Sequence, residues 1–188
     1  KEPLSELRFF RFIETEIAGI SLVIARTGWR GQGGFELYLD APPEGERLWD
    51  TIVDAGADLD LRPGCPNLID RIETGLLSFG NDMTLRNNPI GAGLDRFFKM
   101  GKAAEYLGQK ALEQIAESGP DKRMVRLVVP GAAIGNPRGT CAMEVGEGKR
   151  SGEVTSITYS PRFDCNVGLV YVPVEASCVG TQLIIHGP

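Results

Sequence analysis

The sequence predicts an α+β fold in two parts, with an α+β portion over residues 1–118 and a small antiparallel β domain over residues 119–188. Helix-like spacing of apolar residues occurs only before Gly119-Pro120, and closely spaced strand candidates with no helix between them follow it. The 188 residues include 24 glycines and 12 prolines, a content that favours many turns and short β-elements over a helix bundle.

The first elements are expected to form a hairpin followed by a third strand. Apolar and polar residues partly alternate over residues 7–13, as in a half-buried strand, and Ala18-Gly19 is typical of a turn. Residues 20–25 are expected to be the returning strand. A glycine-rich loop over residues 27–34 then leads to a strand over residues 35–39.

Three helices are expected in the first part. The first begins at Pro42-Pro43 and ends near Gly56, the second begins at Pro66, and the third spans roughly residues 105–117 and ends at Gly119-Pro120. Apolar residues spaced for one buried face support the first two. They are Leu48, Trp49, Ile52 and Val53 in the first helix and Leu68, Ile69, Ile72, Leu76 and Leu77 in the second.

Five short strand candidates separated by Gly- and Pro-rich turns make up the second part. They cover residues 123–129, 140–145, 152–158, 166–172 and 181–186. This spacing predicts an antiparallel sandwich or barrel. The strand at residue 7 has no element before it and Gly187-Pro188 leads to no further strand, so both ends of the chain are expected to be cut.

Composition excludes several classes of protein. A net charge of −5 without a basic stripe disfavours a nucleic-acid partner. No apolar run is long enough to suggest a membrane partner or a signal peptide, and a cytoplasmic location is expected. His186 is the only histidine, which disfavours Ser/His/Asp triads and histidine-rich metal centres. No CxxC pair is present, so the four cysteines are expected to be free buried thiols and no metal is expected.

The loop before the third strand and the strand itself hold the candidate binding residues. The GxGG pattern at residues 31–34 precedes a strand, whereas a phosphate cradle follows one, so a tight connection between strands is expected. On a strand, Glu36 and Tyr38 share a face opposite Phe35 and Leu37. A carboxylate there can accept two parallel hydrogen bonds from a planar donor pair, such as a guanidinium or the edge of a pterin. The alternative is a solvated glutamate without a binding role.

Four polar residues further along have simpler interpretations. Arg71 and Glu73 are two apart on the second helix and do not face each other, so surface charge or helix–strand tethering is expected. Asn81-Asp82 is typical of a turn, and nothing local supports Asp82 as a catalytic carboxylate.

Three separated motifs, in one order across nearly the whole chain, resemble a known family. They are RTGWRGQGGFELY over residues 26–38, RIETGLLSFGND over residues 71–82, and GEVTSITYSP over residues 152–161 followed by residues 168–173. Together they resemble the glycine cleavage T-protein (aminomethyltransferase) superfamily. The resemblance implies part of a T-protein-like folate-binding α+β domain followed by a small antiparallel C-terminal β-barrel.

Within the superfamily the chain looks most similar to the dimethylsulfoniopropionate demethylase branch. Trp29 stands where T-proteins usually have tyrosine, a GQGG run follows it, and GCPN over residues 64–67 precedes the second helix. T-proteins generally carry an arginine about where Asn67 stands. An aminomethyltransferase or related folate-dependent enzyme is the alternative, and a non-catalytic folate-binding module is another.

The resemblance implies tetrahydrofolate as cofactor and a small-molecule methyl donor, with 5-methyltetrahydrofolate and methylmercaptopropionate as products of the demethylase. It places Glu36 at the bidentate pterin position and Tyr38 beside it in the cleft. Trp29 offers an indole face to a sulfonium cation. The family's catalytic or orienting aspartate lies in an N-terminal half that this sequence lacks, so a C-terminal fragment is expected, with unknown catalytic residues. Whether it forms a homodimer stays open.

Overall fold

The computed structural model describes residues 4–29, 33–65, 67–102, 104–134, 141–144 and 150–185. It forms two compact units, Lys1–Asn67 (the first unit) and Leu68–Pro188 (the second unit). This division differs from the domain boundary expected near residue 119, which stays a prediction. The helix start expected at Pro66, residues 140 and 145 of the strand expected over 140–145, and His186 lie outside the described residues. The start expected for the last strand at residue 181 is wrong, because the strand begins at Ile184.

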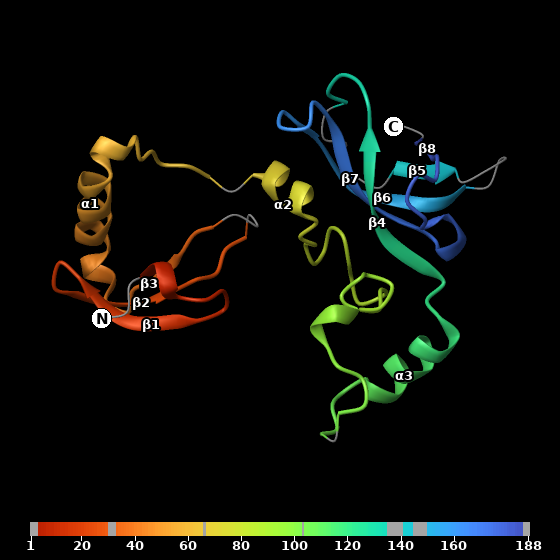
Figure 1. The fold of residues 1–188 in the computed structure, drawn as a ribbon, viewed down its shortest axis with the longest axis horizontal. Helices are drawn as coiled ribbons and strands as arrows, with labels where there is room; N and C mark the ends of the chain where they lie inside the picture. Colours follow the sequence, from red (N-terminus) through yellow and green to blue (C-terminus); the bar gives the residue numbers. More distant parts are fainter. Residues whose placement is uncertain are drawn as a thin grey trace. The chain divides into compact units, whose positions relative to one another are not determined.

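A three-stranded antiparallel sheet forms the first unit, with the order β1-β2-β3 (Figure 1). Its strands are β1 (Phe12–Ile17), β2 (Ile20–Ala25) and β3 (Glu36–Tyr38). The turn expected at Ala18-Gly19 is confirmed, with φ of 50° and 76°, and Ile17 pairs with Ile20 across it. The strand expected over residues 7–13 is wrong for most of its length, because the left-handed φ of 60° at Phe10 interrupts an extended backbone.

One helix, α1 (Gly45–Ala55), covers one face of this sheet. Leu48 packs with Ile20, Leu22 and Ile24 in the core of the unit, and Ile52 packs against them. Trp49, expected on the buried face, is 56% exposed. Leu48 and Ile52 are four residues apart and share a face, whereas Trp49 is turned about 100° away from Leu48.

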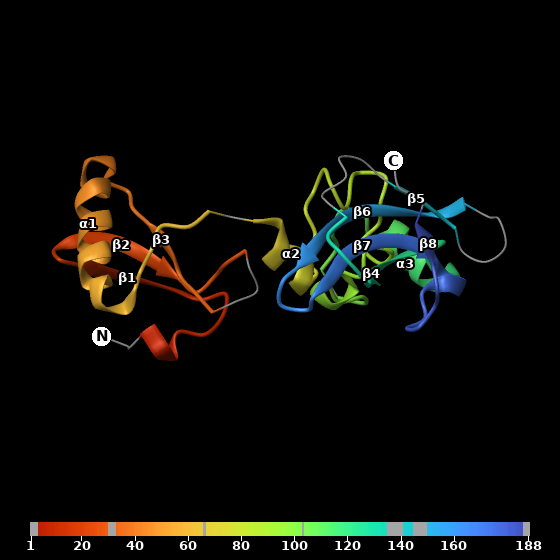
Figure 2. The same cartoon turned by 90° about the horizontal axis from the view of Figure 1, so that it is seen from above.

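In its described residues, the second unit has two α-helices, a five-stranded sheet and short 3-10 segments (Figures 1 and 2). The helices are α2 (Leu68–Thr74) and α3 (Gln109–Ser118). The strands are β4 (Lys122–Val129), β5 (Cys141–Glu144), β6 (Arg150–Ser160), β7 (Cys165–Pro173) and β8 (Ile184–Ile185). All neighbours in the order β4-β7-β6-β5-β8 are antiparallel, as expected.

The sheet of the second unit curves around one apolar core. Val154, Val170 and Val172 from its central strands are at most 2% exposed. Val125 and Val129 pack on this core from β4, and Leu183 and Ile185 pack on it from the other edge. Because side chains from both edge regions meet in one core, the sheet is rolled in the manner of a barrel.

Helix α2 covers the other face of β6 and β7. Ile72 packs there with Val167 and Leu169. The helix ends at Thr74 and Gly75 follows with φ of 74°, so Leu76 and Leu77 continue the apolar pattern outside the helix. Helix α3 begins at Gln109, after Gly108 with φ of 82°, and is four residues shorter at its start than expected. None of the helices in the described ranges has the length and apolar character needed to cross a membrane.

Candidate functional site

The carboxylate of Glu36 lies at the exposed edge of the first unit's sheet. Glu36 pairs with Ala25 of β2, and Tyr38 pairs with Val23. The Tyr38 hydroxyl donates a hydrogen bond to Oε2 of Glu36 at 3.2 Å. This contact between side chains two residues apart on β3 confirms the expectation that Glu36 and Tyr38 share a face, and both residues are exposed.

A third side chain, Thr27, completes this cluster. Its hydroxyl donates to the same Oε2 atom of Glu36. Sequence reasoning assigned Thr27 no role, although a signal was present. Thr27 is two residues beyond Ala25, the cross-strand partner of Glu36, and the two-residue period of a strand carries both side chains to one face. We name Thr27, Glu36 and Tyr38 the Glu36 cluster.

The structure does not join Trp29 to this cluster. Trp29 is 40% exposed in the loop between β2 and β3, and among the described residues it makes no hydrogen bond or ring contact with Glu36 or Tyr38. The opposite face of β3 is only partly covered, since Leu37 is 38% exposed and Phe35, just before the strand, is 39% exposed. The guanidinium of Arg26 lies 5.8 Å from the centre of the Phe35 ring.

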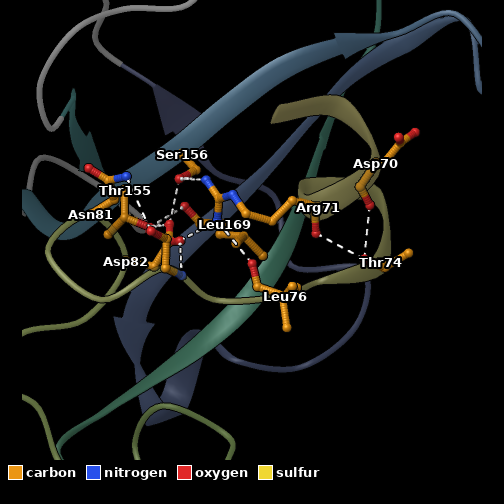
Figure 3. Close-up of polar contacts among 10 residues, drawn as sticks. Asp70, Arg71, Thr74, Leu76, Asn81, Asp82, Thr155, Ser156 and Leu169 are labelled. Carbon is orange, nitrogen blue, oxygen red and sulfur yellow. Dashed lines mark hydrogen bonds and ion pairs between the residues drawn. The ribbon is translucent and has the colours of Figure 1, made fainter. Parts of the chain in front are cut away.

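A second polar cluster is buried in the second unit (Figure 3). Arg71 Nη1 donates to Asp82 Oδ2 at 2.5 Å, and the two side chains are 1% and 0% exposed. The interpretation of Arg71 as a surface charge is therefore wrong, and the alternative of helix–strand tethering is confirmed by its hydrogen bond to Ser156 of β6 at 2.9 Å. Glu73 accepts a hydrogen bond from Ser160 at 2.6 Å, which confirms helix–strand tethering for that residue.

The carboxylate of Asp82 is fully engaged within the protein. Oδ1 accepts from the hydroxyls of Thr155 at 2.7 Å and Ser156 at 2.5 Å. Oδ2 accepts from Arg71 and from the backbone N–H of Ser78 at 2.8 Å, consistent with the turn expected there. A carboxylate has about four acceptor positions, and all are used here. Asp82 is therefore a structural anchor with no position left for a ligand.

The two clusters differ in what they can do chemically. The buried cluster is satisfied by protein donors, whereas the Glu36 cluster presents an exposed carboxylate whose Oε1 accepts no hydrogen bond within the described ranges. That atom can accept N–H donors from a ligand. No group of three or more His, Cys, Asp or Glu side chains in the described part of the chain is placed to hold a metal ion. The Glu36 cluster is the candidate binding site.

Comparison with known proteins gives consistent matches along the whole chain. Residues 2–102 match the family described as GCVT N-terminal domain, and residues 122–186 match the glycine cleavage T-protein C-terminal barrel domain. The chain is 39% identical to the dimethylsulfoniopropionate demethylase DmdA of Ruegeria pomeroyi, covering 100% of this chain and 50% of that protein. It is 35% identical to an aminomethyltransferase of Symbiobacterium thermophilum, covering 98% of this chain and 50% of that protein.

The fold agrees with these matches. The crystal structure of glycine cleavage system aminomethyltransferase T from Bartonella henselae superposes with a TM-score of 0.81 at 29% identity, covering 98% of this chain and 50% of that one. The chain thus spans about half the length of the curated relatives it matches. Matches to both domain descriptions, in order, show that the chain belongs to the glycine cleavage T-protein (aminomethyltransferase) family.

Proposed function

We propose that the whole protein transfers a methyl group to tetrahydrofolate, with dimethylsulfoniopropionate as the donor, and that Glu36 binds the pterin ring. The observation that carries this proposal is the exposed Glu36 carboxylate, whose Oε2 accepts from two neighbouring hydroxyls and whose Oε1 accepts from none of the described residues. The similarity to a dimethylsulfoniopropionate demethylase supports this choice of donor.

The residues present fit the pterin. An ionised carboxylate only accepts hydrogen bonds, and the 2-amino group and N3–H of a pterin are two donors on one edge of a planar ring. Tyr38 is 56% exposed beside Glu36, so a flat ligand can lie against its ring. When bound, tetrahydrofolate supplies the nitrogen that accepts the methyl group.

The residues of this chain then serve to position the pterin ring and the methyl donor. Glu36 orients the ring through its N–H edge, and Trp29 offers an indole face to the sulfonium cation of the donor. Because a sulfonium is already a good leaving group, alignment of donor and acceptor is the main demand on the protein.

Tetrahydrofolate titration of the whole protein tests the role of Glu36. Glu36→Gln removes the charge while keeping the side-chain size, and we expect the Kd to rise about tenfold or more. The control is Glu46→Gln, the same chemical change at an exposed position on α1, which packs on the opposite face of the sheet. If the Glu36→Gln variant binds tetrahydrofolate as tightly as the unmodified protein does, Glu36 does not bind the pterin ring.

A second candidate activity is aminomethyl transfer, which the similarity to aminomethyltransferases favours. The two activities have different products. Methylmercaptopropionate and 5-methyltetrahydrofolate form from dimethylsulfoniopropionate, whereas an aminomethyl carrier gives a methylenetetrahydrofolate product. Parallel assays with the two donors decide between them, and folate binding without turnover of either donor would indicate a non-catalytic folate-binding module.

A further inference from the structure

We propose that Thr27 is a positioning residue, whose hydroxyl fixes the orientation of the Glu36 carboxylate before the ligand binds. This inference rests on the proposed function of Glu36. Thr27 acts on the ligand only through Glu36 and does not itself need to touch it.

The residue before Thr27, Arg26, is held by three hydrogen bonds to the segment before β1. The Arg26 N–H donates to the Arg11 carbonyl at 2.9 Å, and the Arg26 carbonyl accepts from the Phe10 N–H at 3.0 Å. The Arg26 guanidinium also donates to the carbonyl of Leu7 at 2.8 Å. These bonds tie the end of β2 to the segment before β1, so the position of the Thr27 hydroxyl is set by the fold of the first unit.

Two donors from the described part of the chain converge on one carboxylate oxygen of Glu36. Thr27 and Tyr38 donate to Oε2 of Glu36, which uses both acceptor positions of that oxygen. The plane of a free carboxylate rotates easily about its last torsion, and two donors on one oxygen select one orientation. The result is that Oε1, with its two acceptor positions, is presented to the exposed side.

The two hydroxyls are not equivalent. Tyr38 donates across 3.2 Å, which is longer than the usual O–H···O distance of about 2.5–3.0 Å, and lies two residues from Glu36 on the same strand. Thr27 comes from the other side of the β2–β3 connection, nine residues away. A ligand N–H that approaches Oε2 can displace the long Tyr38 bond while Thr27 keeps the carboxylate in place. Thr27 is therefore the more important of the two donors for orientation.

Tetrahydrofolate titration of a double-mutant cycle in the whole protein tests this inference. Thr27→Val removes the hydroxyl at nearly constant volume and is expected to raise the Kd about tenfold, whereas Thr27→Ser keeps the hydroxyl and is expected to bind within about twofold of the unmodified protein. Tyr38→Phe is expected to raise the Kd less than Thr27→Val does. In a Glu36→Gln background, Thr27→Val is expected to cause no further loss, because the carboxylate it orients is gone.

The outcomes separate the inference from the proposed function. If Glu36→Gln leaves the Kd unchanged, or the unmodified protein does not bind tetrahydrofolate, the pterin role fails and this inference fails with it. If Glu36→Gln weakens binding but Thr27→Val does not, only the role of Thr27 is overturned. A Thr27→Val loss that adds in full to the Glu36→Gln loss shows an independent role and also overturns it. Thr27→Ala replaces Thr27→Val, with the same expectations, if circular dichroism shows that the valine variant is unfolded.

Discussion

Arg71 and Asp82 form an ion pair from which water is excluded, with 2.5 Å between Nη1 and Oδ2 and side-chain exposures of 1% and 0%. Arg71 also donates to Ser156 of β6 at 2.9 Å and to the Leu76 carbonyl at 2.9 Å. The pair thus joins α2, the loop that follows it and the sheet of the second unit (Figure 3). A buried pair of this kind is most sensitive to the loss of one partner, because the other charge then stays buried without compensation.

Replacing Asp82 by alanine should therefore destabilise the second unit strongly. We expect Asp82→Ala to lower the free energy of unfolding by about 3–5 kcal/mol, because it leaves the Arg71 guanidinium and three further donors without their acceptor. Chemical denaturation followed by far-ultraviolet circular dichroism measures this loss. The control is Asp95→Ala, which removes an exposed carboxylate from the same unit and should change stability by less than about 0.5 kcal/mol. Equal stability of the two variants would contradict a structural role for the pair.

The sequence could predict the elements whose signals are local. Strand β2 was expected at residues 20–25 and is found there, because the Ala18-Gly19 turn fixes where it starts. Strand β1 was misplaced because alternation over residues 7–13 looks like a strand, while the left-handed backbone at Phe10 depends on a hydrogen bond to Arg26. That contact joins residues far apart in the sequence and leaves no local signal.

The candidate site was predictable to a similar degree. Glu36 and Tyr38 share a face because of the two-residue strand period, which sequence alone supplies. Predicting that Thr27 belongs to the site requires the register between β2 and β3. That register is known only from the structure, in which Ala25 pairs with Glu36. The burial of Arg71 was not predictable, since Ser156, one of its partners, is 85 residues away.

Asn166 should be needed for the segment that follows β4. Its side chain is 0% exposed, and its amide group donates to the carbonyls of Ala132 at 2.9 Å and Val129 at 3.3 Å while its Oδ1 accepts from the Ile134 N–H at 3.1 Å. Asn166→Ala removes three partly buried hydrogen bonds to the backbone at once, and we expect a loss of about 2 kcal/mol in the free energy of unfolding.

Asn166→Asp should be still less stable at neutral pH, because it places a carboxylate oxygen against the two carbonyls that the amide group served. The control is Gln182→Glu, the same amide-to-carboxylate change at an exposed position, which should leave stability nearly unchanged. Denaturant unfolding of the three variants in one buffer tests the order. An aspartate variant as stable as the unmodified chain would show that the amide donors are dispensable.

Gly168 should not tolerate a side chain. A Cβ atom there would lie 2.8 Å from the carbonyl oxygen of Ser156 on the neighbouring strand and 3.4 Å from Cγ1 of Ile157. Because the first contact is with backbone, relief requires a shift of β6 or β7, and Gly168→Ala is expected to lower the free energy of unfolding by about 1–3 kcal/mol. Far-ultraviolet circular dichroism during denaturation measures it.

The same substitution at Gly45 is a matched comparison. A Cβ atom there meets nothing within 4 Å, and Gly45 is the first residue of α1. Gly45→Ala should therefore stabilise the helix, by up to about 1 kcal/mol. Tryptophan fluorescence reports the first unit for this variant, since both tryptophans, Trp29 and Trp49, lie in it. A loss of stability at Gly45 as large as that at Gly168 would contradict the steric explanation.

Tyr171 should make the chain less stable at alkaline pH. Burial raises the pKa of its hydroxyl above the usual value of 10.0, and the carboxylates of Asp82 and Glu153 raise it further. Tyr171 is 5% exposed, and its hydroxyl has no hydrogen-bond partner in the described part of the chain. Because the unfolded chain releases this proton at lower pH than the folded chain does, the associated stability is fully present below about pH 10 and is lost as the pH rises toward the folded-state pKa.

Tyr171→Phe removes this titration without removing the ring. Near pH 7 we expect the phenylalanine variant to be at least as stable as the unmodified chain, since the substitution removes a buried hydroxyl that forms no hydrogen bond with any described residue. Above about pH 10 the difference should grow in favour of the variant. Unfolding free energies measured between pH 7 and pH 11 test this, with Tyr38→Phe as the control at an exposed tyrosine. A constant difference across that range would show that the Tyr171 hydroxyl titrates alike in the folded and unfolded chain.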